Sequence, residues 1–474
     1  MKTKFSLLFI VFFSFFTANA EIKISALLGD NMVMQRNTEI KLWGKAQAGK
    51  KIVVFTSWNG NKTNTICNAK GEWLVKVKTT EAGGPYTISI TSGKEKKLLR
   101  NILLGEVWLC SGQSNMEMPV AGFRDQPING SNDALMDADN NNIRLFTVKR
   151  NANMMPQDTV LGSWDIASAV SVAQFSAVGY FYAKKLQQKL NIPIGMICSC
   201  WSGSRIEAWM SNETIIKYPE PYALTSTGEI SVHNKASNLY NGMIAPIVNY
   251  IIKGVLWYQG ESNILEYKDY SALMSGMVSN WRKDFGIGEF PFYFVQIAPF
   301  KYKNSSAITT ALLRDEQLKA SYIIPGSDIV CTMDIGDEQT IHPAEKEILG
   351  KRLACMALSE TYKMKGINYK SPTFKNMTVK DSVAIISFDN IVMGLTSYGK
   401  EVESFQVAGE DKIFYPAKAT ISKSMVNVSA PQVKVPVAVR YGYCNFPKTN
   451  GFLFNTAGLP VPSFRTDKWE EDKL

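Results

Sequence analysis

Residues 105–116 read GEVWLCSGQSNM, an apolar run followed by a polar loop that contains glycine and serine. The run GEVWLC is nearly continuous in apolar side chains, which is typical of a strand in a parallel sheet that is covered on both faces. Open α/β sheets bind ligands at the carboxyl ends of such strands. The stretch therefore predicts that Ser114 lies where a buried strand meets a loop, either as an ordinary turn residue or as a nucleophile.

More apolar runs share this character, and two stretches with helical spacing lie among them. The further runs occupy residues 192–200, 254–259, 290–298 and 327–335. The helical stretches are FSAVGYFYAKKLQQKL at 175–190 and PAEKEILGKRLACMALSETYK at 343–363. In the latter, Leu349, Leu353 and Ala357 fall on one helix face. Alternating strands and helices predict an α/β domain with a doubly wound parallel sheet.

The segments on either side of this domain have a different hydrophobic pattern. Short alternating runs such as KIVVFTSW and EWLVKVKT, separated by glycine-containing turns, predict a small β-sandwich over residues 21–100. Strand-like runs such as VAIISFD and VPVAVRYGY return later and predict a C-terminal β region over residues 369–474. The α/β domain then occupies residues 101–368.

The first twenty residues have the composition of a secretory signal peptide. Lys2 and Lys4 precede the apolar run FSLLFIVFFSFF, and ANA at 18–20 is a small-residue cleavage site. No later run is long and apolar enough to span a bilayer. We therefore expect an exported protein, periplasmic or secreted, that does not insert into a membrane.

Composition and charge argue against a nucleic-acid-binding protein. The 474 residues are 45% hydrophobic and 20% charged, with a formal net charge of +10. This charge is spread along the sequence, whereas a nucleic-acid partner usually requires a concentrated basic stripe. The seven cysteines form no pair of CxxC motifs, and HExxH, Walker and dinucleotide-binding motifs do not occur. These patterns argue against a nucleic-acid partner and against a zinc site.

Four polar loops follow predicted strands and should meet at one edge of the sheet. They contain SGQSNM, WSGSRIEAW, GESN and GDEQTIHP. A serine nucleophile needs a general base, usually histidine, and the chain has only His233 and His342. His342 follows one of these strands, whereas His233 lies in a polar stretch with no apolar strand before it. We therefore pair Ser114 with His342 and expect His233 at the surface.

Acyl transfer also requires hydrogen-bond donors for the developing oxyanion. The backbone N–H groups of Ser114 and Gly203 are candidates, and a side-chain amide from Gln259 or Asn263 is a third. Each of these residues also fits an ordinary turn or capping role. The G-x-S-x-G motif of α/β-hydrolases is absent around Ser114. A cysteine nucleophile at Cys110 is a weaker alternative, because that residue ends an apolar strand.

The order of these motifs resembles that of a known family. GQSNM, the loop containing EAW, WYQGESN and IHP resemble the sialate O-acetylesterase family of SGNH-type hydrolases, and the resemblance extends to YNGMIAPI and the tail beginning VRYGYCNFP. It covers most of the chain after residue 20. It implies a three-layer SGNH hydrolase core carrying β domains, and an esterase that removes acetyl groups from sugar hydroxyls without a metal or organic cofactor.

The resemblance also assigns roles to individual residues. Ser114 matches the family nucleophile and His342 its base. Gly203 matches the second oxyanion position, and the amide position falls on Gln259, with Asn263 as the alternative. These assignments agree with the roles inferred from the strand ends.

The sequence departs from the family pattern at the acid that orients the histidine. SGNH enzymes generally have an aspartate three residues before the histidine, or in some relatives two before, and these positions hold Gln339 and Thr340. Asp334, Asp337 and Glu338 are nearby alternatives, of which the two aspartates are the stronger candidates. A serine–histidine dyad without an acid is the remaining alternative.

A second departure is Arg205, where many relatives have an uncharged residue. Its guanidinium could hold a substrate carboxylate bidentately, or pair with a neighbouring acid such as Glu207. The leading hypothesis is an O-acetylesterase acting on O-acetylated sialic acids through an acyl-enzyme. The alternatives are an esterase acting on plant polysaccharides such as xylan, and a non-catalytic glycan-binding protein.

Overall fold

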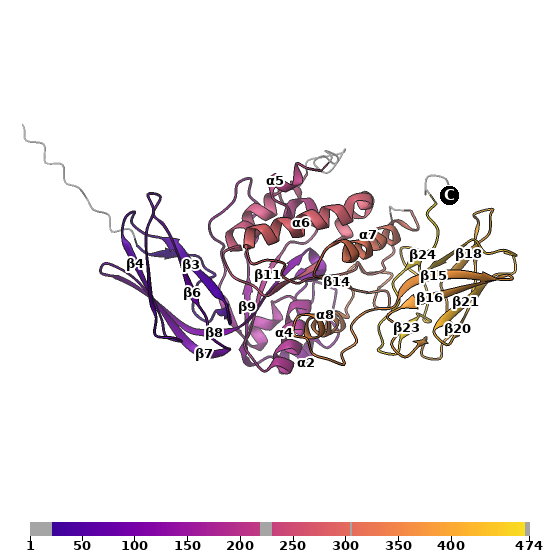
Figure 1. Ribbon diagram of the computed structural model, residues 1–474, viewed down its shortest axis with the longest axis horizontal. Coiled ribbons are helices and arrows are strands. Elements are labelled where there is room, and N and C mark those ends of the chain that lie inside the picture. Colours follow the sequence, from indigo (N-terminus) through magenta and orange to yellow (C-terminus); the bar gives the residue numbers. More distant parts are fainter. Residues whose placement is uncertain (1–20, 219–229, 304–305, 470–474) are drawn as a thin grey trace, which may run out of the picture.

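The structure is a computed structural model that describes residues 21–218, 230–303 and 306–469. The predicted signal peptide lies outside the described residues. A β domain, an α/β core and a second β region follow one another along the long axis of the molecule (Figure 1). No helix within the described ranges is both long and apolar enough to cross a membrane.

The core is built on a central, mostly parallel sheet. Its strand order is β10 (Trp164–Ala167), β9 (Asn140–Thr147), β11 (Ile194–Cys200), β8 (Glu95–Gly112), β12 (Gly254–Tyr258), β13 (Phe292–Val295), β14 (Ser327–Val330). Strand β10 pairs antiparallel with β9, and the other neighbours are parallel. Strands β11 and β12 are buried along their whole length, as their continuous apolar sequences predict.

Helices cover both faces of this sheet and make a three-layer core. On one face α4 (Ala177–Leu190) packs against α8 (Lys346–Glu360), and on the other α6 (Tyr270–Phe285) packs against α7 (Thr309–Ile323) (Figure 1). Shorter helices are α1 (Ser114–Glu117), α2 (Ser131–Met136), α3 (Ala169–Ala173) and α5 (Asn212–Ile215). The predicted α/β fold is confirmed, with one antiparallel edge strand added to the sheet.

The N-terminal β domain is continuous with the core through β8. One sheet of this domain holds β1 (Lys23–Ile24), β3 (Glu39–Lys45) and β6 (Glu72–Lys78). The other strands are β2 (Val33–Gln35), β4 (Lys51–Thr56), β5 (Lys62–Ile66) and β7 (Gly83–Ser92). The first part of β8 pairs with β7 and β2, and its last part pairs with β11 and β12. The predicted boundary at residue 100 therefore falls inside one strand.

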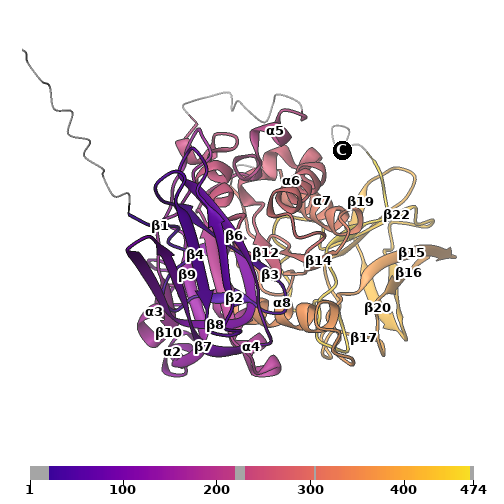
Figure 2. The same cartoon turned by 60° about the vertical axis from the view of Figure 1, so that its left-hand side comes forward.

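The C-terminal β region contains two four-stranded antiparallel sheets and a short pair. The sheets are β15 (Thr373–Lys380), β16 (Val383–Asp389), β21 (Met425–Ser429), β20 (Lys418–Ser422), and β19 (Phe414–Pro416), β18 (Phe405–Ala408), β22 (Ala438–Tyr441), β24 (Phe464–Arg465). The pair is β17 (Leu395–Thr396) with β23 (Phe454–Asn455). This region lies beside the core on the side of α7 and α8 (Figures 1 and 2). Buried Arg314 of α7 donates to the Cys444 carbonyl at 2.6 Å and ties the two parts together.

Candidate active site

Ser114 lies at the carboxyl end of the central strand β8, as the sequence predicts. The strand ends at Gly112, and α1 begins at Ser114. Gly112 has a φ of +136°, and a Cβ atom there would lie 2.1 Å from the carbonyl oxygen of Tyr258 on β12. Only glycine accommodates this close approach of two backbones, which brings Ser114 to the strand ends of β8 and β12. The neighbouring Gln113 fixes the loop after β12, because its Oε1 accepts the N–H groups of Gly260 and Ser262.

His342 contacts Ser114 directly. Its Nε2 lies 2.7 Å from Ser114 Oγ, which is a hydrogen-bond distance between a base and a nucleophile. Its Nδ1 lies 2.5 Å from Oε1 of Gln126. An amide oxygen only accepts hydrogen bonds, so Nδ1 carries the proton and Nε2 is free to take the proton of Ser114. The side chains therefore have the relationship required for general-base activation of the serine.

Gln126 reaches the imidazole from a tight turn between α1 and α2. The backbone N–H and C=O groups of Phe123 and Gln126 bond to each other, at 3.1 and 3.0 Å. Gly122 has a φ of +83°, and a Cβ atom there would lie 2.5 Å from the Gln126 carbonyl oxygen. The turn also places the Phe123 ring edge-to-face against His342, with 5.3 Å between ring centroids. Phe123 and Gln126 together hold the imidazole in one orientation.

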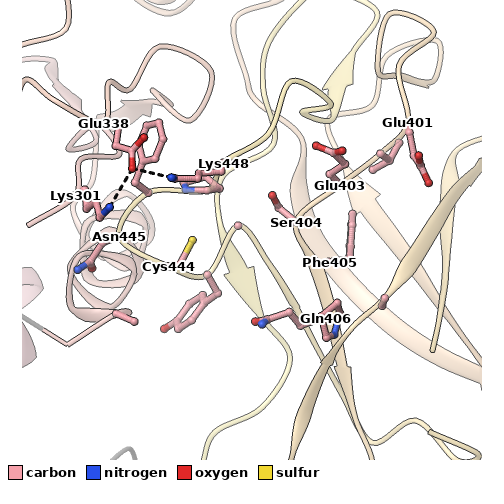
Figure 3. Close-up of a pocket in the computed structure, with 18 of the residues that line it drawn as sticks. Lys301, Glu338, Glu401, Glu403, Ser404, Phe405, Gln406, Cys444, Asn445 and Lys448 are labelled. Atoms are coloured by element: carbon pink, nitrogen blue, oxygen red, sulfur yellow. Dashed lines mark hydrogen bonds and ion pairs between the residues drawn. The ribbon is translucent and has the colours of Figure 1, made fainter. Parts of the chain in front are cut away.

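The acids predicted near His342 have other partners. Asp334 forms a bidentate ion pair with Arg352 of α8, at 2.9 and 2.6 Å. Asp337 accepts the backbone N–H groups of the two residues at 339 and 340. Glu338 binds Lys301 and Lys448 (Figure 3). The expectation that Asp334 or Asp337 orients His342 therefore does not agree with the described structure, where Gln126 takes that place.

A cleft that Glu338 lines lies away from the place where Ser114 and His342 meet. It has a volume of about 800 Å³ and is lined by Glu338 from the core and by residues such as Glu403 and Phe405 of the C-terminal β region (Figure 3). Neither Ser114 nor His342 lines it. A cavity of about 280 Å³ is lined by Phe123, whose ring contacts His342, and by Glu117 of α1.

The surroundings of His342 favour the uncharged imidazole. Burial lowers the pKa of His342 to about 4, and the Lys346 ammonium contributes in the same direction. A base with this pKa remains unprotonated from mildly acidic pH upward. Cys110, the alternative nucleophile, is completely buried, and burial raises the pKa of its thiol well above the usual value. Its environment therefore opposes thiolate formation, which disfavours a cysteine mechanism.

Gly203 is an exposed residue in the loop after β11, and two side chains hold this loop in place. Its φ is +71°, which favours glycine, and no heavy atom outside its chain neighbours lies within 4 Å of a Cβ built on it. Glu117 of α1 accepts the N–H and Oγ–H of Ser202, at 2.8 and 2.5 Å. Asn234 donates to the Gly203 carbonyl and accepts the N–H of Arg205. This loop is thus connected to the helix that begins with Ser114, and its open backbone allows a substrate to approach.

Gln259 and Asn263 are positioned differently from the prediction. Both are completely buried. The Gln259 Nε2 donates to the Ser204 carbonyl at 3.1 Å and to Asn263 Oδ1 at 2.8 Å, while Asn263 Nδ2 donates to the carboxylate of Glu207. Through these hydrogen bonds the Gln259 and Asn263 amides support the loop after β11. In this structure neither is an available oxyanion donor, which leaves the backbone N–H groups of Ser114 and Gly203.

Arg205 is also occupied by protein partners. Its guanidinium pairs with Glu207 at 3.0 Å and with Glu266 at 3.3 Å, and only 12% of its side chain is exposed. Of the two roles considered for Arg205, the structure supports pairing with acids rather than binding of a substrate carboxylate.

Sequence reasoning missed two residues near the site. Gln126 lies in no recognised motif, and only its proximity to the imidazole reveals it. Glu117 follows GQSNM directly, and its position one helical turn after Ser114 was an available signal. His233, which the sequence predicts at the surface, is partly exposed, and its ring stacks on Trp201 in the loop that contains Gly203, with 5.1 Å between ring centroids.

Comparison with known proteins shows the family. Residues 104–359, more than half of the chain, match the family described as carbohydrate esterase, sialic acid-specific acetylesterase. The chain is 33% identical to a carbohydrate acetylesterase from Xanthomonas citri, with a TM-score of 0.86 over 94% of this chain and all of the other. It is 26% identical to the sialate O-acetylesterase of Homo sapiens and 25% identical to that of Mus musculus, over 94% of this chain and 93% and 95% of theirs. The chain belongs to the sialic acid-specific acetylesterase family of carbohydrate esterases.

Proposed function

We propose that this carbohydrate acetylesterase is a serine hydrolase that removes acetyl groups from O-acetylated sialic acids. The observation that supports the mechanism best is the 2.7 Å contact between Ser114 Oγ and His342 Nε2, with Nδ1 held by Gln126. The preference for sialic acids is supported by the family match and by relatives described as sialate O-acetylesterases.

The proposed reaction has two halves. In the first, Ser114 Oγ attacks the acetyl carbonyl carbon while His342 Nε2 takes the hydroxyl proton. The N–H groups of Ser114 and Gly203 stabilise the oxyanion, and the sugar oxygen leaves with the proton from His342. In the second half, His342 takes a proton from water, which attacks the acetyl-serine ester. Acetic acid departs as the proton returns to Ser114 Oγ, and it ionises to acetate in solution.

Two alternatives are less well supported. Deacetylation of xylan involves the same chemistry and differs only in the sugar, so a substrate comparison separates it from the proposal. A non-catalytic glycan-binding protein would not need the aligned Ser114 and His342. We also propose that the protein is exported, periplasmic or secreted, because residues 1–20 have the composition of a signal peptide.

The proposal is tested by measuring acetate released from O-acetylated sialic acid and from acetylated xylan in parallel assays. Wild-type protein should release acetate faster from the sialic acid. Ser114→Ala should lose activity by about a million-fold, as nucleophile removal does in serine hydrolases. Ser424→Ala, at an exposed position in the C-terminal β region, is the matched control and should behave as wild type. Folded Ser114→Ala protein with wild-type turnover would refute the serine mechanism, and faster release from xylan would refute the sialic acid preference.

A further inference from the structure

Lys346, the first residue of α8, is a completely buried lysine four residues after His342. Lysine is almost never fully buried unless it is paired with an acid. The Lys346 Nζ instead donates to Oδ1 of Asn115 at 2.5 Å, and it lies 5.5 Å from the centre of the Tyr258 ring. No salt bridge to Lys346 occurs within the described residues. The reaction outlined above does not use this buried cation.

Asn115 connects Lys346 to both halves of the catalytic pair. It follows Ser114 directly in the chain, and its Nδ2 donates to the carbonyl of Ile341, the residue before His342, at 3.0 Å. The same Nδ2 donates to Oε1 of Glu261 at 2.5 Å. Asn115 is completely buried and Glu261 nearly so. The helix that bears the nucleophile and the loop that bears the base are therefore joined through one buried amide, whose oxygen is bound by Lys346.

We propose that Lys346 is a positioning residue for the hydrolysis: it holds Asn115 between the Ser114 and His342 segments, and its buried ammonium repels a second positive charge on the imidazole. This inference rests on the proposed serine mechanism. The Lys346 side chain touches neither Ser114 nor His342 by hydrogen bond in the described structure, and it acts through Asn115 and through space.

The charges around these groups support the electrostatic part of the proposal. Burial lowers the pKa of Lys346 to about 7, and the nearby Glu261 carboxylate acts in the opposite direction. Lys346 is therefore protonated in the acidic range where His342, with its pKa of about 4, titrates. Lys346 is the charged group that acts on His342 from α8, and Gln126 and Phe123, which face the imidazole from the α1–α2 turn, are uncharged.

The other acids of these elements have partners elsewhere. Asp337 and Glu338, in the loop before His342, bind backbone N–H groups and lysines, respectively. Glu345 accepts a hydrogen bond from Asn129, and Glu347 pairs with Lys351. No acid therefore offsets the effect of the Lys346 ammonium at the imidazole by direct contact within the described residues.

The decisive experiment is a pH profile of kcat/KM for Lys346→Met, measured by acetate release from an O-acetylated sugar. Removing the ammonium should raise the pKa of His342, so the acidic limb should move to higher pH by about one unit. The kcat measured above the acidic limb should also fall about tenfold, because Asn115 Oδ1 loses the Lys346 ammonium as its hydrogen-bond donor. Lys351→Met is the matched control, since Lys351 lies on the same helix in an exposed ion pair with Glu347. It should leave both the limb and the plateau unchanged.

Asn115→Ala separates the two roles proposed for Lys346, which are to hold Asn115 in place and to repel positive charge on the His342 imidazole. It should lower kcat while leaving the acidic limb near its wild-type position, because Lys346 keeps its charge. If Lys346→Met does not fold, Lys346→Gln keeps a donor for Asn115 and tests the charge by the same profile. A folded Lys346 variant with the wild-type limb and plateau would overturn the proposal. A wild-type protein that releases no acetate would instead overturn the proposed function, so the two failures are distinguishable.

Discussion

Replacing Gln126 by alanine should slow hydrolysis without abolishing it. The Gln126 Oε1 is the acceptor for His342 Nδ1–H at 2.5 Å. Its removal leaves a half-buried donor unpaired, which costs about 1–3 kcal/mol. If this cost appears in the transition state, kcat falls by about 5- to 150-fold. Removal of a triad carboxylate costs up to about ten thousand-fold, because a charge that stabilises the imidazolium is lost as well. Gln126 is neutral, so the smaller loss is expected.

Replacing Gln126 by glutamate gives a second, independent observable. A carboxylate at this position favours the imidazolium, and a neighbouring opposite charge raises a pKa by about 1–3 units. Since the pKa of His342 is about 4 in the wild type, the acidic limb of kcat/KM should move upward, toward about pH 5–7. Activity at pH 5 should fall, because more of the base is protonated there.

Both variants are assayed by acetate release between pH 3.5 and 8, with circular dichroism to confirm folding. Gln188→Ala, on the exposed surface of α4, is the matched control and should retain the wild-type profile. A folded Gln126→Ala protein with wild-type kcat, together with a Gln126→Glu protein with an unmoved acidic limb, would refute the role of Gln126. A ten thousand-fold loss in Gln126→Ala would show that the histidine depends on this side chain more than a neutral acceptor explains.

Further substitutions test the rest of the site. His342→Ala should lose activity by about a million-fold. His233→Ala should keep most of its kcat, because His233 contacts Trp201 and neither Ser114 nor His342 in the described structure. Equal losses in the two folded variants would show that the base is misassigned. Asp334→Asn should lower the free energy of unfolding in urea by about 3–5 kcal/mol, since it breaks a nearly buried ion pair, while kcat at pH 7 stays near wild type. Asp337→Asn should also keep its kcat, and a loss of several thousand-fold in either aspartate variant would restore that acid as the partner of His342. Gln259→Ala should lower the free energy of unfolding by about 1–3 kcal/mol; unchanged unfolding with a hundred-fold lower kcat would instead indicate an oxyanion donor.

Local sequence pattern was sufficient to predict the architecture and the central pair. The run GEVWLC predicts a buried strand because its apolar character is continuous, and the structure shows it as the last part of β8. The carboxyl ends of neighbouring parallel strands must meet, so Ser114 after β8 and Gly203 after β11 were expected at one edge. His342 could be chosen over His233 because only one of the two follows a predicted strand. These inferences need only the order and periodicity of residues along the chain.

The partners of these residues depend on distances that no local pattern contains. Gln126 and His342 are 216 positions apart and meet because the turn after α1 folds back over the loop before α8. Asp334 and Asp337 are the acids near the histidine in sequence, but in the structure Arg352 pairs with Asp334 and backbone N–H groups donate to Asp337. Gln259 ends a predicted strand run and directly follows β12, yet its amide is completely buried and bonded to Ser204 and Asn263. Sequence by itself thus determined which strands and loops carry the site residues. The direction of each side chain and its hydrogen-bond partners from distant segments were decided only by the tertiary structure, which brings those segments together.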